Sequence, residues 1–121
     1  MLKPAAAAAA ALALVCAGCA GPDPASSTRV GADLSDEAAG RGLRIASVTC
    51  ASCHAIGTEG ASPMPEATPF REIVHRYPLD RLEEAFAEGL VTGHPAMPPF
   101  VFRASEIDDL VAYLETVRTA P

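Results

Sequence analysis

The chain has 121 residues, which is room for one small domain. Fifteen acidic residues outnumber nine basic ones, so the formal net charge is -6. An acidic surface argues against nucleic acid and anionic lipid as binding partners, because both are negatively charged. An acidic surface would complement a basic patch on a protein partner, but a need for solubility explains the net negative charge equally well.

The first predicted element is an export signal over residues 1–19. A positive start at Lys3 is followed by a short apolar run over residues 5–15 and then by small residues, as in a secretory leader. The run is too short for an ordinary membrane-spanning helix, which needs about 20 residues. Export predicts a periplasmic location for the mature chain.

The end of the leader has two interpretations. Cys19 follows Ala17-Gly18 as in a lipoprotein box, where this cysteine would become a lipid anchor, although Cys16 stands where leucine is usual. The alternative is ordinary cleavage after Ala20. In either case Lys3 is lost, which leaves eight arginines against fifteen acids.

Residues 20–34 predict a flexible linker, because prolines, glycines and serines interrupt any apolar period. With a lipid on Cys19 the linker would tether a folded domain, residues 35–121, to a membrane. After ordinary cleavage it would be a disordered N-terminus.

The first helix is predicted over residues 35–48. Ser35 is a good N-cap, and the acidic residues after it suit the first turn of a helix. Ala39, Leu43 and Ala46 recur at helical spacing and mark an inward face. Gly42 is unfavourable inside a helix by about 1 kcal/mol relative to alanine. Its presence suggests that another helix crosses closely there.

Cys50-Ala51-Ser52-Cys53-His54 is a C-x-x-C-H motif, the pattern that attaches a haem covalently to a polypeptide. Two thiols three positions apart on a helical turn can each add to one vinyl group of the same porphyrin. The next residue then lies under the ring, where its imidazole can reach the iron. This motif predicts one covalently bound haem c.

A C-x-x-C pair has two other common uses. One is a disulfide, either structural or exchanging. The other is zinc, which binds cysteine and histidine side chains, but Cys53 and His54 are adjacent and the chain has no second C-x-x-C. The histidine and the upstream export signal favour haem.

A loop over residues 57–68 precedes two short predicted helices. The first starts at Thr68-Pro69, presents Phe70, Ile73 and Val74 as its apolar stripe, and stops at Pro78. The second runs from Leu79 to Glu88, with Leu82, Ala85 and Phe86 inward, and Gly89 terminates it.

Residues 93–100 contain too many prolines for a helix or a central strand. The last helix is predicted to follow, with Ser105 as its N-cap and Asp108 completing a capping-box-like pair. Its inward face is Ile107, Leu110, Val111, Leu114 and Val117. Since no segment alternates like a strand, the chain is predicted to be all-α, with about four helices. Its core is thin, and a buried porphyrin would supply apolar volume.

The chain resembles the class I c-type cytochromes, in particular small bacterial monohaem ones. The run from Gly42 to Cys50 is similar to the first helix of the family, Gly93-His94-Pro95-Ala96-Met97-Pro98 to its methionine loop, and residues 106–114 to its last helix. The resemblance implies a cytochrome c-like fold around one haem. It also implies that the last helix crosses the first, with Tyr113 set against Gly42.

The resemblance also implies roles at the haem. Cys50 and Cys53 would bond the vinyl groups, His54 would be the proximal iron ligand and Met97 the distal one. The carbonyl of Pro63 would accept a hydrogen bond from the other ring nitrogen of His54, with Pro65 as a competitor.

Three other residues, Met64, His94 and His75, also carry side chains that can bind iron. Met64 is a rival distal ligand but lies close to His54 in sequence, and His94 is a rival three residues from Met97. His75 is expected to be solvated or between helices. Met97 remains the favoured distal ligand.

Histidine and methionine together would saturate the iron and leave no place for a substrate. A thioether ligand raises the reduction potential. We therefore expect a single-electron carrier rather than an enzyme, acting as a monomer or as a subunit of a larger complex, with redox proteins as donor and acceptor. Two alternatives remain: a haem sensor or peroxidase-like enzyme with an open distal site, and a thiol–disulfide exchange protein.

Overall fold

The computed structural model describes residues 24–89 and 96–121. It contains four helices: α1 (Pro24–Thr49), α2 (Phe70–Arg76), α3 (Leu79–Glu88) and α4 (Ala104–Thr119). No strand occurs among these described residues. The predicted all-α class is therefore confirmed. The predicted leader, with Cys16 and Cys19, lies outside the described residues.

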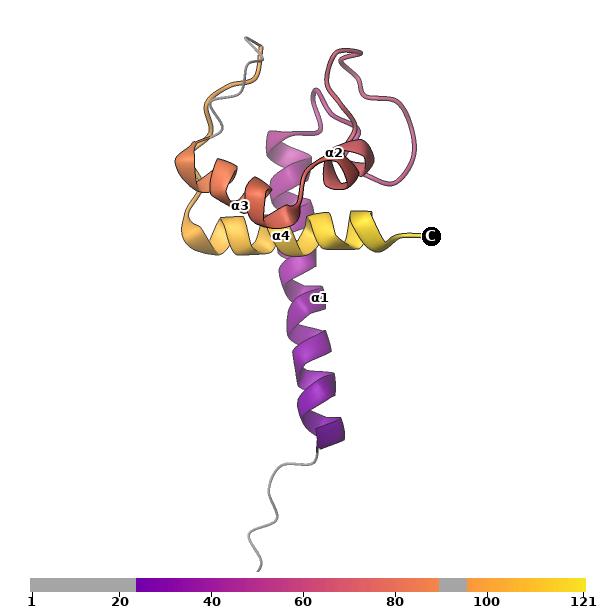
Figure 1. Cartoon of the computed structure of the whole chain (residues 1–121), viewed down its shortest axis with the longest axis vertical. Helices are drawn as coiled ribbons and strands as arrows, with labels where there is room; N and C mark the ends of the chain where they lie inside the picture. The colour runs from indigo at the N-terminus through magenta and orange to yellow at the C-terminus, as the bar shows by residue number, and fades with distance from the viewer. Residues whose placement is uncertain (1–23, 90–95) are drawn as a thin grey trace, which may run out of the picture.

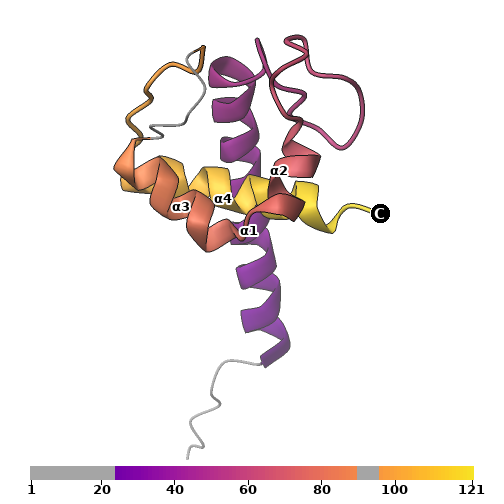
Figure 2. The same cartoon turned by 45° about the horizontal axis from the view of Figure 1, so that its top comes forward.

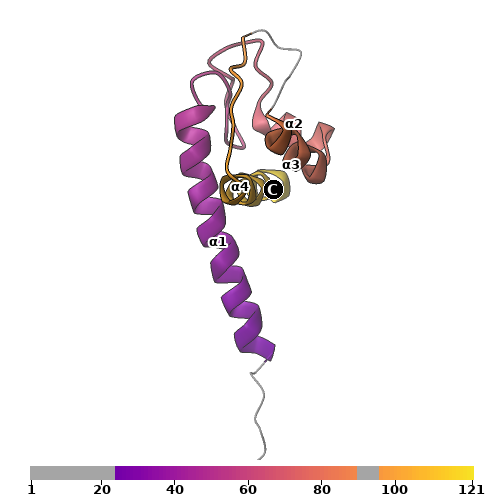
Figure 3. The same cartoon turned by 90° about the vertical axis from the view of Figure 1, so that its left-hand side faces the viewer.

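Helix α4 runs across α1 (Figure 1). Seen from the side, α1 packs on one face of α4, and the pair α2 and α3 packs on the opposite face (Figure 3). The C-terminal end of α1, the loop that follows it and the segment 96–103 all lie on the same side of α4 (Figure 2). This side is where the C-x-x-C-H motif follows α1.

Helix α1 begins at Pro24, not at Ser35, so the predicted start is wrong. The Ser35 hydroxyl does not cap the helix but donates to the Gly31 carbonyl one turn earlier, at 3.0 Å. Residues 31–37 are exposed, and this half of α1 projects past the other helices (Figure 1). Residues 24–34, for which the sequence predicts a flexible linker, are thus helical, because extending a packed helix is easier than starting a new one.

The crossing of α1 and α4 depends on Gly42. A Cβ atom built there would lie 2.7 Å from the Tyr113 Cβ and even closer to the Asp109 carbonyl oxygen. Only glycine permits this approach, so the predicted pair of Gly42 and Tyr113 is confirmed. The fully buried Ala46 continues the contact one turn later.

Leu43 was predicted to face inward with Ala39 and Ala46, but 41% of its surface is exposed. The close contact at Gly42 selects a face made of positions 39, 42 and 46. Leu43 is one residue further round the helix, about 100° away, and so falls at the edge of that face.

An ion pair borders the crossing. The Arg41 guanidinium donates to both carboxylate oxygens of Asp109, at 2.8 to 3.0 Å. Asp109 is buried, whereas 48% of the Arg41 side chain is exposed. The pair therefore satisfies a carboxylate that the packing of α4 removes from water.

Helices α2 and α3 lie where the sequence predicts them, but the inward face predicted for α3 (Leu82, Ala85 and Phe86) is only half-buried. Pro69 immediately precedes α2, and its Phe70 and Val74 are buried. Helix α3 has the predicted bounds and ends at Gly89, whose φ of 85° is left-handed. Glycine adopts that conformation without steric penalty.

Helix α4 begins at Ala104, so the predicted N-cap at Ser105 and the pairing with Asp108 are wrong. The Glu106 carboxylate instead accepts a hydrogen bond from the Arg103 backbone N–H at 2.9 Å and one from the Arg103 guanidinium at 2.7 Å. This arrangement satisfies an N–H group that the first turn of a helix leaves without a partner.

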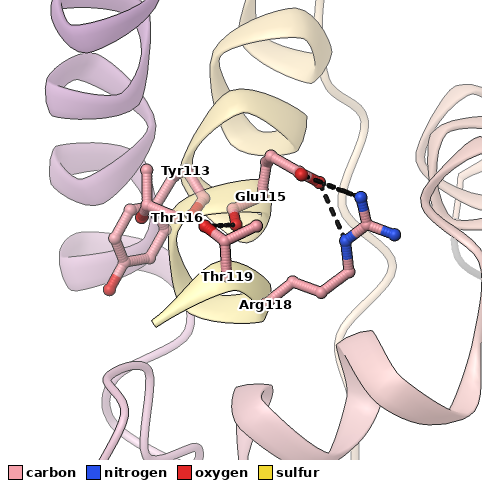
Figure 4. A network of polar contacts seen from close by, with 5 residues as sticks. All are labelled: Tyr113, Glu115, Thr116, Arg118 and Thr119. Carbon is pink, nitrogen blue, oxygen red and sulfur yellow. Dashed lines mark hydrogen bonds and ion pairs between the residues drawn. The ribbon is translucent and has the colours of Figure 1, made fainter. Parts of the chain in front are cut away.

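The inward face of α4 forms the centre of the core. Figure 4 shows Tyr113 on the side of α4 toward α1, away from the exposed pair of Glu115 and Arg118. The predicted inward residues are confirmed except for Val111, which is half-buried. The core cluster consists of Ala46, Phe70, Val74, Leu110, Tyr113, Leu114 and Val117. Within the described ranges, no helix combines the length and apolar character needed to cross a bilayer.

Candidate functional site

The C-x-x-C-H motif forms a tight turn directly after α1. The Cys50 N–H still donates to the Ala46 carbonyl at 2.8 Å, as in a helix. The Cys50 carbonyl then accepts from the N–H groups of Cys53 and His54, at 3.1 and 2.9 Å. The turn thus holds both cysteines and the histidine in one short, hydrogen-bonded unit.

Cys50 and Cys53 form no disulfide with each other, and both are half-buried. Burial, with a smaller contribution from the neighbouring Cys53, raises the pKa of Cys50 to about 11. Since the thiolate is the reactive form in disulfide exchange, a thiol that stays protonated at neutral pH is a poor exchanger. Burial of Cys50 therefore argues against disulfide exchange that starts at that thiol.

His54 is held in a defined orientation and tautomer. Its Nδ1 lies 2.7 Å from the Thr68 carbonyl oxygen. A carbonyl can only accept, so Nδ1 must carry the proton, and Nε2 keeps the lone pair that a metal ligand needs. The ring also packs against Phe70, with the two centroids 5.7 Å apart.

The predicted partner of this nitrogen was the Pro63 carbonyl, and that prediction is wrong. Pro63 and its competitor Pro65 are exposed in the loop, while Thr68 lies where the chain returns to His54. Since Thr68 precedes a proline, it is biased toward an extended conformation. Helix α2 accepts its first bonds at the Pro69 carbonyl, which leaves the Thr68 carbonyl for the histidine.

Half-buried apolar side chains from several parts of the chain pack against the hydrophobic core. Phe86 and Phe102 meet edge to face, with their centroids 5.7 Å apart. The set comes from α1, the following loop, α2, α3 and the segment before α4: Ile45, Cys50, Ile56, Ile73, Leu79, Leu82, Phe86 and Phe102. Such residues retain apolar surface that a flat, apolar porphyrin could cover, so the residues present fit a haem.

Met97 is half-buried and lies in a turn before Pro98 and Pro99. Its segment is on the same side of α4 as the C-x-x-C-H turn (Figures 1 and 2). Its role as the distal ligand stays a prediction. His94, the rival ligand, lies outside the described residues.

The other candidates belong to different surroundings. The Met64 N–H donates to the Cys53 carbonyl at 3.1 Å, so Met64 belongs to the loop beside the cysteines. His75 is exposed on α2, as expected. Across residues 24–89 and 96–121, no three His, Cys, Asp or Glu side chains gather as a metal site.

Sequence reasoning missed two contributors to this site, the Thr68 carbonyl and the Ser62 hydroxyl, which accepts from the Ala55 N–H at 3.0 Å. The Thr-Pro step before a helix was an available signal for the first, because it leaves a carbonyl outside the helical ladder. No local pattern pointed to the second.

Comparison with known proteins gives a consistent result. The family model described as Cytochrome c matches residues 38–118. The chain is 32% identical over 80 residues to Cytochrome c-552 from Bradyrhizobium diazoefficiens, covering 66% of this chain and 75% of that protein. No solved structure gives a significant match.

Proposed function

Since the chain belongs to the cytochrome c family, as a class I c-type cytochrome with covalently bound haem c, we propose that it transfers single electrons between redox proteins with His54 and Met97 as its iron ligands. The observation that carries the proposal is the hydrogen bond from His54 Nδ1 to the Thr68 carbonyl. That bond presents Nε2 as a ligand from a turn that also carries both thiols.

Each residue has a defined part in this function. Cys50 and Cys53 anchor the cofactor through thioether bonds, so the histidine next to them is always available to the iron. When bound, the haem supplies an iron centre that accepts and releases one electron. His54 and Met97 would hold the iron in both oxidation states, so electron transfer would require little movement of the protein, and the Met97 thioether would favour the reduced state.

The site of action is proposed to be the periplasm, in line with the predicted leader. If Cys19 is lipidated, the exposed first half of α1 would act as a stiff spacer of roughly 20 Å rather than as a flexible tether. Mass spectrometry of the mature N-terminus distinguishes an acylated Cys19 from an unmodified Gly21. The protein is proposed to act as a monomer or as a subunit of a larger complex.

Two measurements on the purified holoprotein test the electron-carrier assignment. A redox titration followed by absorbance should give one reversible one-electron wave. The reduced protein at neutral pH should bind carbon monoxide slowly or not at all, because Met97 fills the distal position. Rapid binding of carbon monoxide would favour the sensor or peroxidase-like class and would reject the assignment of Met97.

A further inference from the structure

The backbone just after His54 forms hydrogen bonds with three different parts of the chain. The Ala55 N–H donates to the Ser62 hydroxyl at 3.0 Å, and the Ala55 carbonyl accepts from the Phe70 N–H at 2.9 Å. The Ile56 carbonyl accepts from the Tyr113 hydroxyl at 3.0 Å. Three consecutive peptide groups after His54 therefore each have one fixed partner.

We infer that Ser62 is a positioning residue for His54, an inference that rests on the proposed function of His54 as an iron ligand. The Ala55 N–H belongs to the same planar peptide group as the His54 carbonyl. Fixing that N–H fixes the orientation of the His54 backbone, and with it the direction from which the imidazole reaches the Thr68 carbonyl. Tyr113 acts two peptide groups further on, so its influence on His54 is weaker.

Ser62 lies beside the backbone of residues 53–55 because the loop folds back along the C-x-x-C-H turn. The Met64 N–H donates to the Cys53 carbonyl at 3.1 Å, so residues 62–64 run beside residues 53–55. Of the two hydrogen bonds that join these segments, the one from Ala55 uses a side-chain acceptor. A single substitution of Ser62 therefore removes that bond and leaves the backbone unchanged.

The consequence concerns the strength of His54 as a ligand. A firm hydrogen bond from Nδ1 to a carbonyl makes the imidazole a better electron donor, which favours ferric iron. Without the Ser62 hydroxyl, His54 moves more freely and its bond to Thr68 weakens. The Nδ1 proton then exchanges faster with solvent, and the midpoint potential rises.

The test compares Ser62→Ala and Ser62→Thr holoproteins with the wild type. Proton exchange at His54 Nδ1 is measured by NMR on the ferrous protein, and the midpoint potential by redox titration. In Ser62→Ala, exchange should be about tenfold faster, as expected for the loss of one hydrogen bond, and the potential should be higher. Ser62→Thr keeps a hydroxyl and should restore both values.

Ser47→Ala is the matched control, because the exposed Ser47 hydroxyl donates to the Leu43 carbonyl within helix α1, at 2.7 Å. It should change neither quantity. Unchanged exchange or an unchanged potential in Ser62→Ala would overturn the inference, as would equal changes in Ser47→Ala. A wild-type protein with no reversible one-electron wave would instead reject the proposed function, so the two failures are distinguishable.

Discussion

Replacing Gly42 by alanine tests the close crossing of α1 and α4. The added Cβ would lie 2.6 Å from the Asp109 carbonyl carbon and 2.7 Å from the Tyr113 Cβ. Comfortable carbon–carbon contacts need about 3.5 to 4.0 Å, so α4 would have to retreat by about 1 Å. The nearest atoms belong to backbone or lie next to it, so no side-chain rotation relieves the contact.

The expected loss of stability follows from opposing terms. Overpacking typically destabilises by about 1 to 3 kcal/mol, and retreat of α4 also weakens the nearby pair of Arg41 and Asp109. Alanine recovers about 1 kcal/mol through its better helix propensity. The net loss should be about 2 kcal/mol, which lowers the midpoint of thermal unfolding by roughly 10 °C.

The assay is urea unfolding of the holoprotein, followed by circular dichroism and by haem absorbance. Gly31→Ala is the control, because a Cβ there meets nothing within 4 Å and the residue lies in the exposed half of α1. Gly31→Ala should lose no stability. If Gly42→Ala were as stable as the wild type, or if both variants lost the same amount, the role assigned to Gly42 would be refuted.

Two further predictions concern ion pairs of α4. Arg41→Met should lower the free energy of unfolding by about 2 kcal/mol, because it leaves the buried Asp109 carboxylate without its partner. Asp109→Asn should lower it by only about 1 kcal/mol, because the arginine left behind is half exposed. Equal losses in urea unfolding would contradict this prediction. Glu106→Gln should reduce stability at neutral pH. Hydrogen bonds from Arg103 hold the pKa of Glu106 below its usual 4.5 in the folded chain. That stabilisation is present above the unfolded pKa and is lost as pH falls through the folded value. The difference between wild type and Glu106→Gln should therefore shrink below about pH 4.5, and a difference that stays constant between pH 7 and pH 3 would count against it.

Local signals predicted the parts of the fold that depend on neighbouring residues. The bounds of α3 follow from Pro78 before it and Gly89 after it, and both act within one turn. The predicted start of α4 was wrong because it relied on the N-cap preference of a single residue. Ser105 is a favourable N-cap in isolation, but the hydrogen bonds between Arg103 and Glu106 place the start of the helix earlier.

Features that depend on the path of the chain could not be predicted from local patterns. The bond between Arg41 and Asp109 joins residues 68 positions apart. The partner of His54 is set by where the loop returns, which is at Thr68 rather than Pro63. The crossing at Gly42 was predicted, but the decisive support came from the family resemblance rather than from glycine spacing.

The optical spectrum of the oxidised holoprotein at neutral pH tests the central claim, an iron centre closed on both faces by His54 and Met97. The spectrum should contain the weak band at the red edge that reports a methionine sulfur on ferric iron. The band should persist in His94→Ala and vanish in Met97→Ala. A wild-type spectrum without this band, or a band that survives in Met97→Ala, would contradict the account.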